Sequence, residues 1–125
     1  MFAPIQSEQN GAYKMKKSEQ NAINEKCERE FELAKIAMKK QLDNKGYIDA
    51  KRLRTCNAKI FITDDYYILC SYNTYVAVIN RNTDTLYDVL RIVYGYTATS
   101  AQHIAKFNHD YCENKWGCKE RLTAR

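Results

Sequence analysis

The stretch AKIFITDDYYILCSYNTYVAVI, residues 58–79, decides the fold. It is rich in β-branched and aromatic residues, and two turn-forming dipeptides, Asp64-Asp65 and Tyr72-Asn73, divide it into three apolar runs. Short runs of this composition, separated by two-residue turns, are typical of neighbouring strands joined by hairpins. The stretch therefore predicts three antiparallel strands, over 58–63, 66–71 and 74–79.

Downstream of these strands, residues 86–94 continue the apolar pattern after a turn at residues 81–84. We expect a fourth strand there, while the same residues also fit a helical turn. Together these segments predict an antiparallel β-meander of three to four strands. Thr99, with Gln102 three residues later, has the form of a capping box and predicts the start of a C-terminal helix that packs on the sheet.

Upstream of the strands, residues 18–42 contain neither glycine nor proline. Apolar residues recur there at every third or fourth position: Ile23, Cys27, Phe31, Ala34, Met38 and Leu42. This period predicts a long N-terminal helix, and Gly46 is a suitable residue to end it. Residues 49–56 read as a short helical connector, so the expected fold class is α+β.

A chain of 125 residues fits one domain. Residues 1–13 contain Pro4 and Gly11 and show no periodicity, so we expect a flexible arm followed by a single α+β domain over residues 14–125. No apolar window is long enough to cross a bilayer, and the first residues lack the form of a secretory signal. We therefore expect a cytoplasmic protein without a membrane partner.

The cysteines and histidines of the C-terminal segment have a spacing that suits a metal. Five cysteines are an odd number, which argues against a complete disulfide framework. His109 and Cys112 share one face of a helix, and Cys118 returns after a turn. Zinc takes four Cys or His ligands, and Cys56 or Cys70 would supply the fourth from the sheet. The spacing therefore has two interpretations, ordinary free cysteines or a structural zinc site.

No catalytic signature occurs in the sequence. His103 has no nucleophile or carboxylate at a recognisable spacing, and Ser71, Thr99 and Ser100 fit turn and cap positions better than they fit nucleophiles. The four glycines are scattered and form no phosphate-binding loop. We therefore expect a protein that is not an enzyme.

The net charge of +5 is unevenly distributed. Residues 14–54 carry twelve Lys or Arg against seven Asp or Glu, whereas residues 57–100 carry three against four. Such a bias favours an acidic or polyanionic partner, although interleaved glutamates also fit a solvated helix face. Eight of the ten tyrosines lie between residues 47 and 96 and suit an interface. The predicted partner-binding residues are Lys39, Lys40, Lys51, Arg52, Arg54, Tyr67 and Tyr75.

Two segments, of the form SYNTxVA at residues 71–77 and TSxxHIxKF at residues 99–107, carry a resemblance. They resemble a module of small uncharacterised proteins of phages and mobile elements of low-GC Gram-positive bacteria. Some small phage proteins without enzyme motifs inhibit host defence, and anti-CRISPR inhibitors of Cas9 are one such group. The resemblance therefore implies a phage-encoded protein that binds a bacterial defence complex, such as Cas9 or its guide-RNA complex. The alternative is a small nucleic-acid-binding accessory protein.

Overall fold

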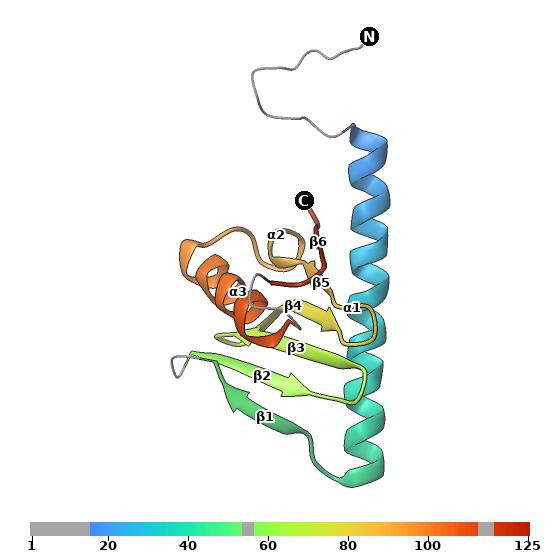
Figure 1. Ribbon diagram of the computed structural model, residues 1–125, viewed down its shortest axis with the longest axis vertical. Coiled ribbons are helices and arrows are strands. Elements are labelled where there is room, and N and C mark those ends of the chain that lie inside the picture. The colour runs from blue at the N-terminus through green and yellow to red at the C-terminus, as the bar shows by residue number, and fades with distance from the viewer. Residues whose placement is uncertain (1–15, 54–56, 113–116) are drawn as a thin grey trace.

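The computed structural model describes residues 16–53, 57–112 and 117–125. The predicted arm at residues 1–13, Arg54 and Cys56 lie outside the described residues. The elements in chain order are α1 (Lys17–Lys45), β1 (Asp49–Arg52), β2 (Ala58–Ile62), β3 (Tyr66–Ser71), β4 (Thr74–Asn80), β5 (Thr85–Asp88), α2 (Leu90–Val93), α3 (Ala98–Tyr111) and β6 (Glu120–Thr123). The predicted α+β class, the long N-terminal helix and the C-terminal helix are confirmed (Figure 1).

The sheet has six strands in the order β1-β2-β3-β4-β5-β6. Strands β1 to β5 form the predicted antiparallel meander, and β6 pairs parallel to β5. The prediction of three to four strands was therefore too low, and the predicted helical connector at residues 49–56 begins instead with strand β1. Both additional strands are polar and mostly exposed, so they lack the apolar alternation that identifies a half-buried strand.

The segment at residues 86–94 divides between the two structures that its sequence allows. Strand β5 ends at Asp88, and α2 begins at Leu90. The Asp88 carboxylate accepts the backbone N–H of Leu90 at 3.1 Å, which satisfies one of the free amides at the start of the turn. The predicted fourth strand is therefore only four residues long.

The sheet lies between two layers of helix, with α1 against one face and α3 against the other (Figure 1). The short helix α2 contributes Leu90 to the core on the α3 side and Ile92 to the core on the α1 side. Cross-strand register assigns the faces. Phe61, Ile68, Val78 and Tyr87 pair across β2 to β5 and face α1. Ile60, Leu69 and Ala77 pair across β2 to β4 and face α3. Because successive side chains alternate in direction, each central strand contributes to two cores.

Helix α1 buries the middle of its predicted apolar stripe. Cys27, Ala34 and Met38 are buried, whereas Leu42 is 48% exposed near the end of the helix. Glu30 fixes the helix to the sheet, because its Oε1 accepts hydrogen bonds from the Tyr66 hydroxyl and the Asn80 amide, each at 3.0 Å. Within the described ranges, no helix has the length and apolar character needed to cross a membrane.

The packing of the core on the α1 side can be tested by comparing a buried isoleucine with an exposed one. Ile68 is fully buried, and Ile36 lies on the outer side of α1 and is 53% exposed. Ile68→Ala should lower the free energy of unfolding by roughly 2–5 kcal/mol, because it leaves a cavity. Ile36→Ala should change it by less than about 0.5 kcal/mol. Urea denaturation measures both values, and a decrease below about 1 kcal/mol for Ile68→Ala would contradict the assigned packing.

Candidate functional site

Two of the predicted partner-binding residues lie in one row across the sheet. The register pairs Arg52 with Lys59, Lys59 with Cys70, and Cys70 with Tyr75. Residues paired in this way point to the same face, with their Cβ atoms close together. These four residues, one from each of β1 to β4, are called the cross-strand row below.

The cross-strand row lies on the α1 face of the sheet, at the end that α1 does not cover. The helix stands beside the turn between β2 and β3, and the turn between β3 and β4 points away from it (Figure 1). Arg52 and Lys59 are exposed, and Cys70 and Tyr75 are half-buried. The Tyr75 ring meets Phe61 edge to face, with 6.0 Å between ring centroids. The row thus combines two cations with one aromatic side chain on a part of the sheet that no described helix covers.

The cations of this region differ from those of α1 in their neighbours. Within the residues that the structure describes, Lys51, Arg52 and Lys59 form no ion pair. On α1, Lys35 pairs with Glu32 at 2.8 Å, and Lys39 lies 3.9 Å from Asp43. Among the described residues, the positive charge at β1 and β2 is therefore not balanced by an ion pair, while part of the charge on α1 is balanced within the helix.

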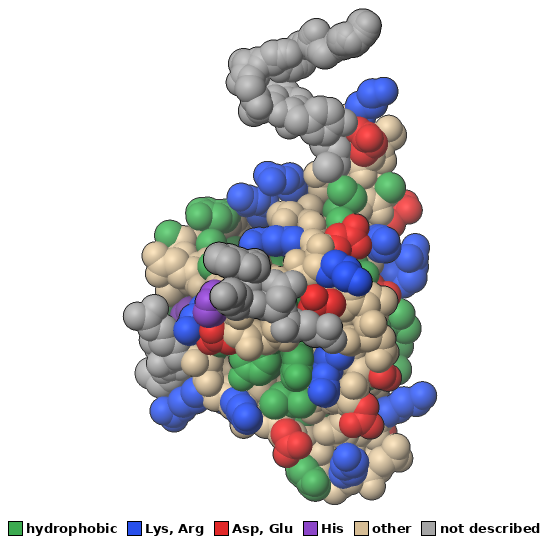
Figure 2. All heavy atoms as spheres, in the orientation of Figure 1, with side chains coloured by type: hydrophobic (Ala, Val, Ile, Leu, Met, Phe, Trp, Pro, Cys, Tyr) green, Lys and Arg blue, Asp and Glu red, His purple; other side chains and the backbone are tan. Residues whose placement is uncertain are grey.

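The remaining predicted contact residues lie away from the cross-strand row. Lys40 lines a shallow hollow between α1 and the turn at Thr63 to Asp65. Tyr67 lies on the opposite face, where its ring packs on Tyr111 at 5.1 Å and under the guanidinium of Arg81 at 4.5 Å. Basic and acidic side chains are mixed over the face shown in Figure 2. The predicted residues therefore do not form one continuous basic surface.

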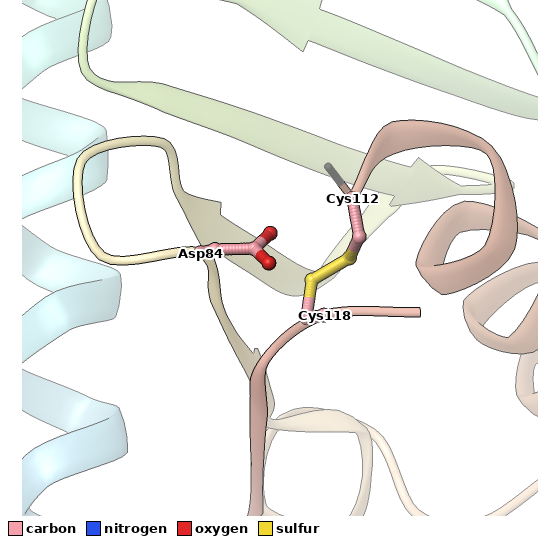
Figure 3. Close-up of side chains that lie close together, drawn as sticks. All are labelled: Asp84, Cys112 and Cys118. Carbon is pink, nitrogen blue, oxygen red and sulfur yellow. A yellow bond between two sulfur atoms is a disulfide. The ribbon is translucent and has the colours of Figure 1, made fainter. Parts of the chain in front are cut away.

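The structure does not support the predicted zinc site. Cys112 and Cys118 form a disulfide, with 4.7 Å between their Cα atoms, and a disulfide sulfur is not the thiolate that zinc binds (Figure 3). His109 is exposed and lies 2.8 Å from the Asp110 carboxylate. Among the described residues, the group with closely spaced ligand atoms is Asp84 with these two cysteines, all within 4.8 Å of one another.

The disulfide joins the end of α3 to the segment that enters β6. Two side-chain oxygens that accept backbone N–H groups fix the same segment. Asn108 Oδ1 accepts the N–H of Cys118 at 3.0 Å, and Asp84 Oδ2 accepts the N–H of Lys119 at 3.0 Å. The expectation of free cysteines holds for Cys27 and Cys70. Spacing alone could not distinguish a metal ligand from a disulfide partner at Cys112 and Cys118.

Sequence reasoning missed a buried polar cluster between the sheet and α3. Ser71 Oγ lies 2.9 Å from Ser100 Oγ and 2.8 Å from His103 Nδ1, and all three residues are buried. Ser71 ends β3, and the other two residues lie on the first two turns of α3. Buried polar groups generally require such partners, so the cluster fixes the helix against the strand.

A cavity of about 410 Å³ lies beside this cluster. Ser71 to Thr74 and Val76 line it from the β3–β4 hairpin, Tyr94 lines it from the end of α2, and Thr97, Thr99 and Ser100 line it from the start of α3. The hairpin turns through Tyr72, whose φ of 58° is left-handed. Thr97 caps α3 by accepting the N–H of Ser100 at 3.2 Å, so the cap lies two residues before the predicted Thr99. The segments 71–77 and 99–107, which carried the resemblance, thus meet at one cavity.

The disulfide predicts a clear result in peptide mapping. Mapping of unreduced, unfolded protein should find Cys112 and Cys118 linked to each other, and Cys27 and Cys70 modified by an alkylating reagent. Cys118→Ser should lower the free energy of unfolding by about 2 kcal/mol, because it releases a short closed loop in the unfolded chain. Alkylation of both Cys112 and Cys118 without a reductant would contradict the pairing.

Burial of His103 predicts a pH dependence of stability. Burial lowers the pKa of His103 below its ordinary value of 6.5, because the protonated ring is poorly solvated there. The unfolded chain therefore takes up the proton first, and stability should fall as the pH drops through 6.5 and below. Urea denaturation at about pH 7.5 and about pH 5 measures the decrease, which should be smaller in His103→Gln. Equal decreases in the two proteins would contradict the assignment.

The comparisons with known proteins place the chain in a family. A model of a family of unknown function, DUF8033, matches residues 36–124, which include all six strands, α2 and α3. No curated protein and no solved structure matches the chain. Because the family match covers more than half of the sequence, the chain belongs to the DUF8033 family of unknown function.

Proposed function

We propose that the protein acts by binding a single-stranded nucleic acid, with the cross-strand row as its contact surface. The observation that carries this proposal is the location of Arg52, Lys59 and Tyr75 on a part of the sheet that no described helix covers. Cations that form no ion pair with any described residue lie there beside an aromatic ring, and a nucleic-acid strand binds to such a combination.

The chemistry of the row matches the two parts of a nucleotide. Arg and Lys neutralise backbone phosphates, which supplies most of the affinity and makes it dependent on salt. Aromatic rings on an antiparallel sheet stack against bases, which only an unpaired strand offers. Lys51, the neighbour of Arg52 on edge strand β1, is also exposed, but it pairs with Ile60 and therefore points to the opposite face from the row. The binding mode therefore favours a single strand over a duplex.

A second candidate function is supported by a different surface. Leu33 and Ile36 are large apolar residues on the outer side of α1, and they are 42% and 53% exposed. A spacing of three residues places them on one face of the helix. A protein partner would cover such residues, whereas a nucleic acid would not. This surface favours the inhibitor hypothesis, in which a phage-encoded protein docks on a defence complex such as Cas9 inside the bacterial cell.

Charge reversal of the row tests the leading proposal. Arg52→Glu combined with Lys59→Glu should abolish binding of a fluorescent single-stranded oligonucleotide. In the single variants, the slope of log affinity against log salt should shrink by roughly 0.7 for each phosphate that the variant no longer neutralises. The control is Lys17→Glu combined with Lys26→Glu on α1, which changes the net charge by the same amount. Equal binding by the two double variants would contradict the proposal.

A double variant of the α1 surface distinguishes the two candidate functions. If the protein is a defence inhibitor, its inhibition of a Cas9 complex should tolerate salt and should disappear in Leu33→Ser combined with Ile36→Ser. That variant should bind the oligonucleotide as well as the unmodified protein does. Inhibition that persists in the serine variant would exclude the α1 surface as the contact.

A further inference from the structure

We infer that the cavity between the β3–β4 hairpin and the start of α3 holds one unstacked base of a bound nucleic-acid strand. The cavity has a volume of about 410 Å³, within the range that suits small ligands. This inference rests on the proposed function, because the cross-strand row supplies the phosphate contacts that bring the strand to the hairpin.

Two tyrosine rings at the cavity provide stacking surfaces. Tyr72 and Tyr94 both line it, and they are 51% and 67% exposed. In the described part of the chain, the Tyr94 side chain makes no hydrogen bond or ring contact, so its face is available to a ligand. Proteins hold an unstacked base by placing such rings against its π face.

The residues that line the cavity favour a ligand that is polar and uncharged. None of its described lining residues is charged, so a phosphate or carboxylate would find no counter-charge there. The hydroxyls of Ser71 and Ser100 lie at its wall, and Asn73 adds an amide. Hydroxyl and amide groups both donate and accept hydrogen bonds, as the edges of the bases require. Burial keeps the pKa of His103 low, so the ring behind Ser71 is neutral near pH 7.

The cavity and the cross-strand row meet at the start of strand β4. Tyr75 belongs to the row on the α1 face, while its neighbours Thr74 and Val76 line the cavity on the other side. The two-residue turn of Tyr72 and Asn73, between β3 and β4, lies between the cavity and the row. A strand that lies across the row and passes over this turn therefore presents its next base to the cavity.

Two measurements test the inference. The first is a titration of isotope-labelled protein with the four common nucleosides alone, which should shift the NMR signals of Ser71, Tyr94 and Ser100. The second is oligonucleotide binding by Tyr94→Ala, compared with Tyr96→Ala. Tyr96 is also exposed, but it packs under Arg91 and does not line the cavity. Tyr94→Ala should weaken binding roughly tenfold or more with an unchanged salt slope, and Tyr96→Ala should bind normally.

The outcomes distinguish this inference from the proposed function. If the oligonucleotide binds through the row but Tyr94→Ala and Tyr96→Ala bind equally well, the base cavity is excluded and the proposed function remains. If nucleosides shift the cavity signals but no oligonucleotide binds, the cavity binds free nucleosides, and both the proposed function and the capture of a base from a bound strand are overturned. If neither probe binds, both are overturned.

Discussion

The sheet must be covered on both faces, and the rest of the structure depends on this requirement. Adjacent residues such as Ile68 and Leu69 are both fully buried, although they point in opposite directions from the same strand. Each buried side chain of this size contributes about 1.5–3 kcal/mol when it leaves water. Strands with two apolar faces are therefore stable only between two layers, and α1 and α3 supply them from opposite ends of the chain (Figure 1).

The two helices cover different parts of the sheet, and this difference creates both candidate surfaces. Helix α1 packs near the turn between β2 and β3, where Glu30 holds it through Tyr66 and Asn80. The other end of the same face is left open for the cross-strand row. On the opposite side, α3 starts at the β3–β4 hairpin, and the gap between hairpin and helix is the cavity. Both proposed binding surfaces, the cross-strand row and the cavity, therefore lie where a helix leaves part of the sheet uncovered.

Elements with a clear apolar period could be predicted from the sequence. Helices α1 and α3 bury one apolar stripe, which is visible as a period of three to four residues. Strands β2 to β4 are visible as short β-branched and aromatic runs bounded by turn dipeptides, although β3 and β4 bury both of their faces. The contact between Ser71 and His103 could not be predicted, because it joins residues 32 positions apart through tertiary packing. The disulfide was missed for a related reason, since the pairing of Cys112 with Cys118 depends on how β6 returns to the sheet. The grouping of Arg52 with Tyr75 required the strand register, which only the fold supplies.

The strands that were missed, β1 and β6, are the two edges of the sheet. Strand β1 reads Asp-Ala-Lys-Arg and β6 reads Glu-Arg-Leu-Thr, so each carries ionic side chains of both signs. An exposed edge invites open-ended addition of further strands, and charged residues on that edge oppose it. The charged residues of β1 and β6 break the apolar pattern by which a strand is predicted. The same charges oppose the pairing of these edges with strands of other chains, and so oppose aggregation.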